Sequence, residues 1–229
     1  MFLLNQRVLT VASKYEVLAA DGTPVLYVER PTYVLRTVLA YGLAFVAAAT
    51  LLGAVEEVPL LSVVLAAAVF MVVSLSARPL RHVTVYRDDS RAATLLRIRQ
   101  NERIAVLTRS YTALLPDGTP LARLRKHYLH NLVRKRWYVE APGGEVLAVA
   151  MEDSIVLSLL RRVLGTFFGV LRTNFVIQRA GGDDVIGEFN RKFALRDRYV
   201  LDMTADPDHT LDRRIAFALG VMLDTGERR

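Results

Sequence analysis

The chain has 229 residues, a formal net charge of +7 and no cysteine. The absence of cysteine excludes disulfides, thiolate metal sites and cysteine nucleophiles. The excess of positive charge favours an anionic partner, either a membrane surface or nucleic acid. The length allows one medium-sized domain beside an apolar segment that begins near residue 37.

The N-terminal residues 1–33 are predicted to contribute the first strands of a β-domain. Residues 15–28 read YEVLAADGTPVLYV, in which Asp-Gly separates two apolar runs, as in a β-hairpin. A cleaved signal peptide is not expected. Met1–Leu4 is too short for an apolar core, and polar residues follow at once.

Residues 34–78 are predicted to form a transmembrane helical hairpin, with helices over 34–55 and 58–77. Thr37–Val55 contains nineteen residues without a charge, and Val58–Ala77 contains twenty. A helix needs about 20 apolar residues to cross a bilayer core. The alternative is a buried helical hairpin of a soluble protein, but two such spans in succession are rare in soluble domains.

The charges around the hairpin predict its orientation. Arg36 precedes the first span, Arg78 and Arg81 follow the second, and Glu56 and Glu57 occupy the bend. Arginine and lysine near span ends stay on the cytoplasmic side. We therefore expect a multi-pass protein of the plasma membrane with both termini and the β-domain in the cytoplasm.

Residues 79–229 are predicted to complete the β-domain. Residues 111–124 repeat the Asp-Gly-Thr-Pro string of the first unit. Looser strand–turn–strand units are predicted at 137–150 and 175–189. Single strands are predicted at 83–86, 94–98 and 199–203. Many short strands with regular turns indicate a barrel or a sandwich.

Two helices interrupt the predicted strands. Residues 154–172 have helical apolar spacing with Arg161, Arg162 and Arg172 on the other side, which fits either a helix packed on the sheet or an interfacial helix with arginines at the headgroups. Residues 211–223 are apolar on every side over their central part and too short to span a bilayer. Such a helix must be enclosed by protein, so we expect it inside the β-domain.

These motifs, in this order, resemble the LURP-one-related and phospholipid scramblase family. The resemblance rests on the strand-DG-strand units, on residues 186–193 (IGEFNRKF) and on the C-terminal pattern from Tyr199 to Asp224. It implies the tubby-like fold, a closed β-barrel of about twelve strands around one hydrophobic C-terminal helix. It also implies a non-enzymatic, lipid-facing protein, since relatives scramble phospholipids or bind phosphoinositides.

The chain departs from that family in two respects. The helical hairpin interrupts the position where the family has a short turn, and it could replace an acyl anchor, because the chain has no cysteine to acylate. The acidic turn Asp88-Asp89-Ser90 lacks the six to eight oxygen ligands that calcium takes. The chain therefore lacks the acidic calcium loop of animal scramblases, and the sequence leaves the calcium dependence of any lipid movement open.

A basic cluster is the candidate lipid-binding site. Alternation on a strand places Arg123 and Arg125 on one face and Lys126 on the other. Arginine forks suit phosphate oxygens, and a tryptophan suits the headgroup layer. By analogy with tubby-like domains the site comprises Arg123, Arg125, Lys126, Arg134, Lys135, Arg136 and Trp137, and the alternative is a solvated basic loop.

Other chemistry has little support in the sequence. His127 and His130 lack a third ligand, so no metal or other cofactor is expected. No phosphate loop or nucleophile with a neighbouring base is recognisable, so we expect a non-enzyme.

The expected function is a membrane-anchored, scramblase-like protein that binds anionic phospholipids and could move lipid between leaflets. The alternative is a membrane-tethered sensor module that binds a protein partner and moves no lipid. Nucleic acid ranks last among the partners, and homo-oligomerisation stays open.

Overall fold

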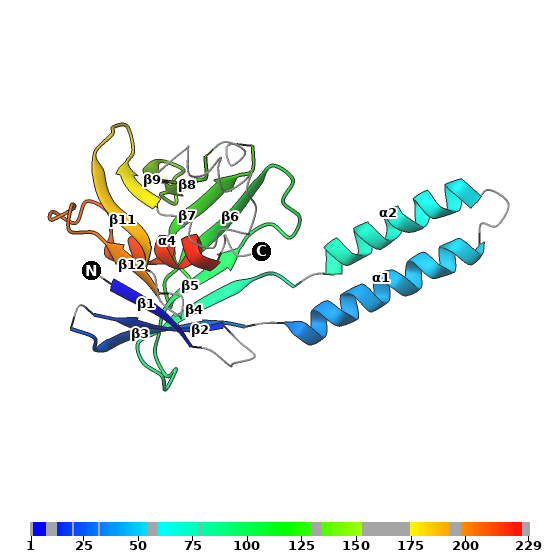
Figure 1. Cartoon of the computed structure of the whole chain (residues 1–229), viewed down its shortest axis with the longest axis horizontal. Coiled ribbons are helices and arrows are strands. Elements are labelled where there is room, and N and C mark those ends of the chain that lie inside the picture. The colour runs from blue at the N-terminus through cyan, green and yellow to red at the C-terminus, as the bar shows by residue number, and fades with distance from the viewer. Residues whose placement is uncertain are drawn as a thin grey trace. The chain divides into compact units, whose positions relative to one another are not determined.

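The computed structural model describes residues 2–7, 13–19, 21–31, 33–54, 59–77, 79–129, 134–152, 175–192 and 198–225. The chain forms two compact units (Figure 1). The sheet unit comprises Met1–Pro31, His82–Asn101 and Val106–Arg229. The helical unit comprises Thr32–Arg81 with Glu102–Ala105.

The helical unit is a pair of long apolar helices, α1 (Val34–Ala54) and α2 (Pro59–Ala77). Their mean hydropathies are 1.9 and 2.5, so both are long and apolar enough to cross a membrane. Small residues at four-residue spacing, Ala40, Ala44 and Ala48, are buried on α1. Small side chains let two helices approach closely, as they do in membranes. The predicted pair of apolar helices is confirmed.

Large apolar side chains cover the outward faces of both helices. Val38, Leu43 and Phe45 on α1 are 60–68 % exposed, and Leu60 on α2 is 79 % exposed. A helix in the core of a soluble protein buries such side chains. The exposed apolar side chains of α1 and α2 therefore do not fit the alternative, a buried helical hairpin of a soluble protein.

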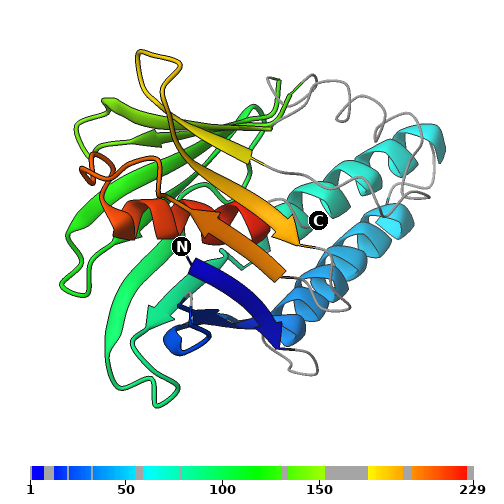
Figure 2. The ribbon, with the colours of Figure 1, turned by 60° about the vertical axis from the view of Figure 1, so that its left-hand side comes forward.

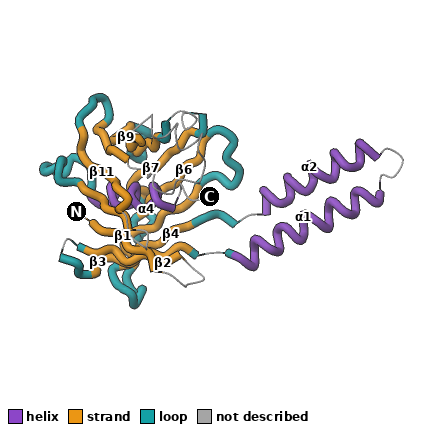
Figure 3. Tube along the Cα trace, in the orientation of Figure 1, coloured by secondary structure: helices purple, strands orange, loops and turns teal. Residues whose placement is uncertain are grey.

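The sheet unit is an antiparallel meander in which strands that follow each other in the chain lie side by side (Figure 3). β2 to β12 form eleven consecutive strands, and β1 pairs with both β2 and β12. The strands are β1 (Phe2–Arg7), β2 (Ser13–Leu18), β3 (Pro24–Arg30), β4 (His82–Tyr86), β5 (Thr94–Gln100), β6 (Thr108–Leu114), β7 (Pro120–His127), β8 (Arg136–Glu140), β9 (Val146–Glu152), β10 (Phe175–Arg179), β11 (Val185–Lys192) and β12 (Arg198–Asp202). The predicted strands are confirmed, and β1 is an additional one.

The two Asp-Gly-Thr-Pro strings form the same turn. Gly22 and Gly118 have φ of +85° and +89°, which only glycine adopts without strain. Asp21 Oδ1 accepts hydrogen bonds from the Thr23 hydroxyl at 2.7 Å and its N–H at 2.9 Å, which hold the pKa of Asp21 below its ordinary value. Asp117 accepts the equivalent bond from the N–H of Thr119 at 2.9 Å. The repeat predicted from sequence is thus a repeat of local structure.

The C-terminal helix α4 (Arg213–Thr225) lies among the strands in both views (Figures 1 and 2). Every residue from Ile215 to Thr225 is buried. Around Gly220, Phe189 of β11 and Leu201 of β12 come within 3.4 Å of the position a Cβ would take. The prediction of an enclosed helix is confirmed, displaced by two residues from the expected 211–223.

Polar groups hold both ends of α4. Asp206 is 1 % exposed, and its carboxylate accepts hydrogen bonds from the N–H groups of Thr210 and Leu211 at 2.9 and 3.2 Å. Arg213 Nη1 lies 3.3 Å from the same carboxylate. At the other end, Arg30 Nη1 donates to the carbonyl oxygen of Thr225 at 3.3 Å, where the helix leaves its carbonyls without intrahelical partners.

We expect Asp206→Ala to lower the free energy of unfolding by about 1–3 kcal/mol at pH 7, because buried donors lose their acceptor. Burial alone raises the pKa of Asp206, but the bonds from Thr210 and Leu211 and the charge of Arg213 bring it below the ordinary 3.8. A lowered pKa means that the stabilisation is complete above pH 3.8 and is lost as the pH falls through the folded-state value. Denaturant unfolding at pH 7 and at lower pH should show the difference from the parent shrink in acid. Asp208→Ala, at an exposed position nearby, is the control.

Gly187 on β11 leaves no room for a side chain. A Cβ there would lie 2.3 Å from Met203 Sδ and 2.7 Å from the carbonyl oxygen of Asp202. The thioether can move, but the backbone carbonyl cannot. We expect Gly187→Ala to destabilise the sheet unit by about 1–3 kcal/mol. Gly143→Ala, with nothing within 4 Å, should leave the melting temperature unchanged, and equal effects of both substitutions would contradict the close approach.

The predicted helix over 154–172, with Arg161, Arg162 and Arg172, lies outside the described residues. What the described residues support is an extended antiparallel sheet with an inserted apolar helix pair and a C-terminal helix.

Candidate functional site

The connections of the sheet gather at two opposite ends, because successive antiparallel strands reverse direction. We call one the hairpin end; there α1 and α2 join β3 to β4, residues 101–107 join β5 to β6, and residues 128–135 join β7 to β8. We call the other the turn end. It carries the short turns after β2, β4, β6, β8 and β10, and the segment 203–212 that leads into α4.

Among the described connecting residues, the two ends carry opposite charge. The described connecting residues of the hairpin end include the basic Arg81, Arg103, Arg134 and Lys135 beside a single acid, Glu102. At the turn end, four arginines (Arg87, Arg91, Arg213 and Arg214) stand against ten acids, namely Asp21, Asp88, Asp89, Asp117, Glu145, Asp183, Asp184, Asp206, Asp208 and Asp212. The basic end is thus the one from which the apolar helices leave the sheet.

The predicted basic cluster is divided between the two faces of the sheet. Lys126 is 8 % exposed and faces inward, with Nζ 5.4 Å from the ring centroid of Trp137. Trp137 is fully buried and also stacks on Tyr111 at 5.9 Å. Both residues therefore belong to the core, and this fold does not support a place for Trp137 in the headgroup layer. Arg123 and Arg125 face outward, as strand alternation predicts.

Arg125 is held in a polar network on the outer face. Its Nη2 lies 2.6 Å from Glu140 Oε1, and its Nη1 lies 2.7 Å from His127 Nε2. A guanidinium only donates, so His127 Nε2 accepts, and Nδ1–H donates to the Thr108 hydroxyl at 3.0 Å. The guanidinium also covers the Tyr138 ring at 5.3 Å. Because Glu140 offsets its charge, Arg125 contributes less to anion binding than an exposed arginine.

Exposed arginines lie beside this network. In the strand register Arg99 of β5 is opposite Thr112 of β6, and Thr112 is opposite Arg123 of β7. Arg97 lies two residues before Arg99, on the same face. We call Arg97, Arg99 and Arg123 the outer arginine face. Strands lie about 4.8 Å apart, so Arg99 and Arg123 start about 10 Å from each other, within reach of one phosphate group or two neighbouring ones.

Hydroxyl and amide groups support the outer arginine face. Arg123 Nη2 donates to Ser110 Oγ at 3.1 Å, and Asn101 Nδ2 donates to the same oxygen at 2.8 Å. Thr112 donates to Asn101 Oδ1 at 2.9 Å. His82, opposite Arg99, has its pKa lowered by burial and then by the charge of Arg99, so it adds no charge at neutral pH. Sequence analysis missed Arg97 and Arg99, although LLRIR at 95–99 alternates as a strand does.

The remaining predicted site residues lie at the hairpin end. Arg134 donates from Nε to the carbonyl oxygen of Glu152, and the N–H of Lys135 lies 3.4 Å from Glu152 Oε2. Arg136 begins β8 and is half-buried. The contacts of Arg134 and Lys135 link the start of β8 to the end of β9, so these two residues stabilise this end of the sheet and also add positive charge there.

The described residues include no group of three metal-ligating side chains. His130 lies outside the described residues. Asp88 accepts bonds from the N–H and the hydroxyl of Ser90, so its carboxylate shapes the turn after β4.

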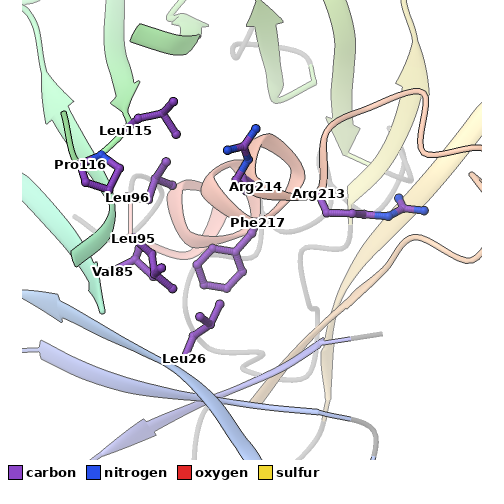
Figure 4. Close-up of a pocket in the computed structure, with 9 residues that line it drawn as sticks. All are labelled: Leu26, Val85, Leu95, Leu96, Leu115, Pro116, Arg213, Arg214 and Phe217. Atoms are coloured by element: carbon purple, nitrogen blue, oxygen red, sulfur yellow. The ribbon is translucent and has the colours of Figure 1, made fainter. Parts of the chain in front are cut away.

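An apolar cavity of about 360 Å³ opens at the turn end (Figure 4). Its walls are Leu26, Val85, Leu95, Leu96, Leu115, Pro116 and Phe217, with Arg213 and Arg214 at its edge. Arg213 pairs with Asp206 at 3.3 Å, and Arg214 pairs with Asp212 at 2.6 Å. The cavity therefore suits an apolar group, and nearby acids offset the charge at its edge.

No protein-family model, curated protein or solved structure matches this chain.

Proposed function

We propose that this protein is anchored in the plasma membrane by α1 and α2 and binds anionic phospholipids through its cytoplasmic sheet unit. The observation that carries the proposal is the exposed apolar surface of the two helices. Val38, Phe45 and Leu60 are each more than 60 % exposed. In water this surface would be costly, whereas the hydrocarbon core of a bilayer would cover it.

We further propose that the sheet unit is a tubby-like closed barrel of the LURP-one-related and scramblase type. Two features support this assignment. β1 pairs with both β2 and β12, the two outer strands of the meander. The helix α4 is buried on every side over Ile215–Thr225, as the central helix of such a barrel would be.

Lipid binding is supported by the distribution of charge. The outer arginine face offers three exposed arginine residues, and the hairpin end carries further basic residues. A tethered basic surface is attracted to an anionic leaflet by about 1 kcal/mol per arginine or lysine near it. With both termini cytoplasmic, the basic end would face the anionic leaflet.

Replacing Arg97, Arg99 and Arg123 together by glutamine should weaken binding to anionic vesicles by at most about a hundredfold, since three contacts of about 1 kcal/mol each are lost. Co-sedimentation at low salt measures this effect on a hairpin-free sheet unit, in which membrane insertion cannot mask it. The matched control replaces Arg87, Arg91 and Arg179 by glutamine, so that the same amount of positive charge is removed from the turn end. Equal losses for the two triple variants would indicate attraction by net charge alone, and no loss would refute the site.

An assay of lipid movement with the full-length chain reconstituted in vesicles distinguishes a scramblase from a protein that only binds lipid. A scramblase makes labelled lipid of the inner leaflet accessible to an external quencher, and a tether does not. Two spans offer a narrow path for lipid, so a scrambling monomer would be surprising.

The second candidate function is a membrane-tethered module that binds a protein partner. The apolar cavity at the turn end favours it, because this end carries the acidic connections and would face away from an anionic leaflet. Unchanged vesicle binding by the outer-face variant together with no lipid movement would favour this candidate.

A further inference from the structure

We propose that two connections at the hairpin end insert apolar tips into the lipid interface, as a membrane contact separate from α1 and α2. The tips are Val106 and Leu107 of the β5–β6 connection and Leu129 of the β7–β8 connection. They are 80 %, 54 % and 59 % exposed. The N–H of Tyr128 donates to the carbonyl oxygen of Leu107 at 2.9 Å, so the two connections touch and the tips belong to one surface. We call Val106, Leu107 and Leu129 the apolar tips.

The connection that leads to Val106 and Leu107 starts with residues that contact the end of α2. Arg103 Nη1 donates to the carbonyl oxygen of Ser76 at 2.6 Å, and Ser76 lies in the last turn of α2, where carbonyls lack helical partners. Residues Glu102–Ala105 belong to the same compact unit as the helices. Val106 follows Arg103 by three residues, and three residues span at most about 11 Å. If α2 crosses the bilayer, Arg103 lies at the interface and Val106 lies within reach of it.

The composition around the tips fits a lipid interface. Ile104, in the same connection, is 48 % exposed. The Arg109 guanidinium lies over the Tyr128 ring at 5.8 Å, and Arg134 and Lys135 follow in the second connection. Apolar side chains in the acyl boundary with tyrosine and basic groups at headgroup level are typical of surfaces that lie on a bilayer.

This inference rests on the proposed membrane anchoring and adds that the sheet unit touches the bilayer at a defined surface. The chain has no cysteine, so single cysteines can carry an environment-sensitive label in the full-length protein. Val106→Cys, Leu107→Cys and Leu129→Cys test the apolar tips. Val185→Cys is the matched control, because Val185 is a 42 % exposed apolar residue that follows a connection of the turn end. Leu43→Cys reports on α1, where the side chain is 60 % exposed.

Each labelled protein is reconstituted in vesicles of phosphatidylcholine and phosphatidylglycerol and challenged with aqueous iodide or with lipids that carry a quencher at shallow or deep positions. We expect labels at the three tips to be quenched by the shallow lipid and several-fold less by iodide than the label at residue 185. The label at residue 43 should respond to the deep quencher. Emission of Trp137, the single tryptophan, which is fully buried, verifies the fold of every variant.

Three outcomes would overturn the proposal. Iodide quenching at the tips equal to that at residue 185, with residue 43 in lipid, would reject the tips while the membrane anchor stands. Iodide quenching at residue 43 would reject the anchor and the inference with it. Protection of the tips from iodide without quenching by the shallow lipid would show that protein, for example a second copy of the chain, covers them.

Discussion

Leu219→Asp is expected to abolish folding of the sheet unit. Leu219 has no exposed surface and lies in the centre of α4, where all residues from Ile215 onward are buried. A carboxylate at this position would lose its hydration without gaining a partner, at a cost of several kcal/mol. Domains of this size are stable by only about 5–15 kcal/mol, so one such change removes most of the stability.

Trp137 reports the result, because the single tryptophan is fully buried in the same core. In the variant its emission should shift to that of exposed indole, with loss of near-ultraviolet circular dichroism. Ala205→Asp introduces the same charge at an exposed position before α4 and should leave both signals unchanged. A folded Leu219→Asp variant with the parental melting temperature would contradict an enclosed helix and the tubby-like proposal.

Removal of the helix pair is expected to transfer the protein from the membrane pellet to the soluble fraction. In the β3–β4 ladder Glu29 pairs with Thr84, so Arg30 and Val83 are the next opposed residues. Joining them by Asn-Gly would give a two-residue hairpin turn that fits the twist of the strands. The sheet unit then keeps its strand order and loses both helices, of 21 and 19 residues, that can cross a bilayer.

Extraction of membranes at alkaline pH measures the transfer. A variant with Tyr41→Ala and Phe70→Ala keeps both helices but loses their ring contact at 6.3 Å, and it should remain in the pellet. Solubility of the full-length chain without detergent would show that α1 and α2 do not anchor it. Reporters at both termini should be cytoplasmic, and a tag beside Glu56 should be accessible from outside.

The described basic and acidic connections of the sheet unit lie at opposite ends of the sheet, which allows each end to have its own binding role. The connectivity places Arg81, Arg103 and Arg134 in the connections of the end from which the helices leave the sheet, and the acidic turns in the connections of the opposite end. Lipid binding and partner binding would then use opposite ends of one domain. The triple variants of the outer arginine face and of the turn end separate these two uses.

Local sequence patterns were sufficient to predict the helices and most of the strands that the structure describes. The uncharged spans predicted α1 and α2 within a few residues, since helix length and side-chain polarity are properties of a continuous segment. The Asp-Gly-Thr-Pro strings predicted two turns that share a positive φ at Gly22 and Gly118, because the turn depends on the residues within it. The centre of α4 is apolar on every side, so its burial could be predicted without knowing how the strands are arranged.

The composition of the candidate site was decided by long-range pairing. Arg99 and Arg123 are neighbours only because β6 aligns Thr112 between them, and a one-residue slip in register would place either arginine on the inner face. The same pairing turned Lys126 and Trp137 inward, although the sequence grouped them with surface arginines. The acidic and basic ends, and the contact between Leu107 and Tyr128, also come from the alternation of connections. Segments predict their own conformation from local chemistry, whereas the grouping of distant side chains depends on which strands pair and in which register.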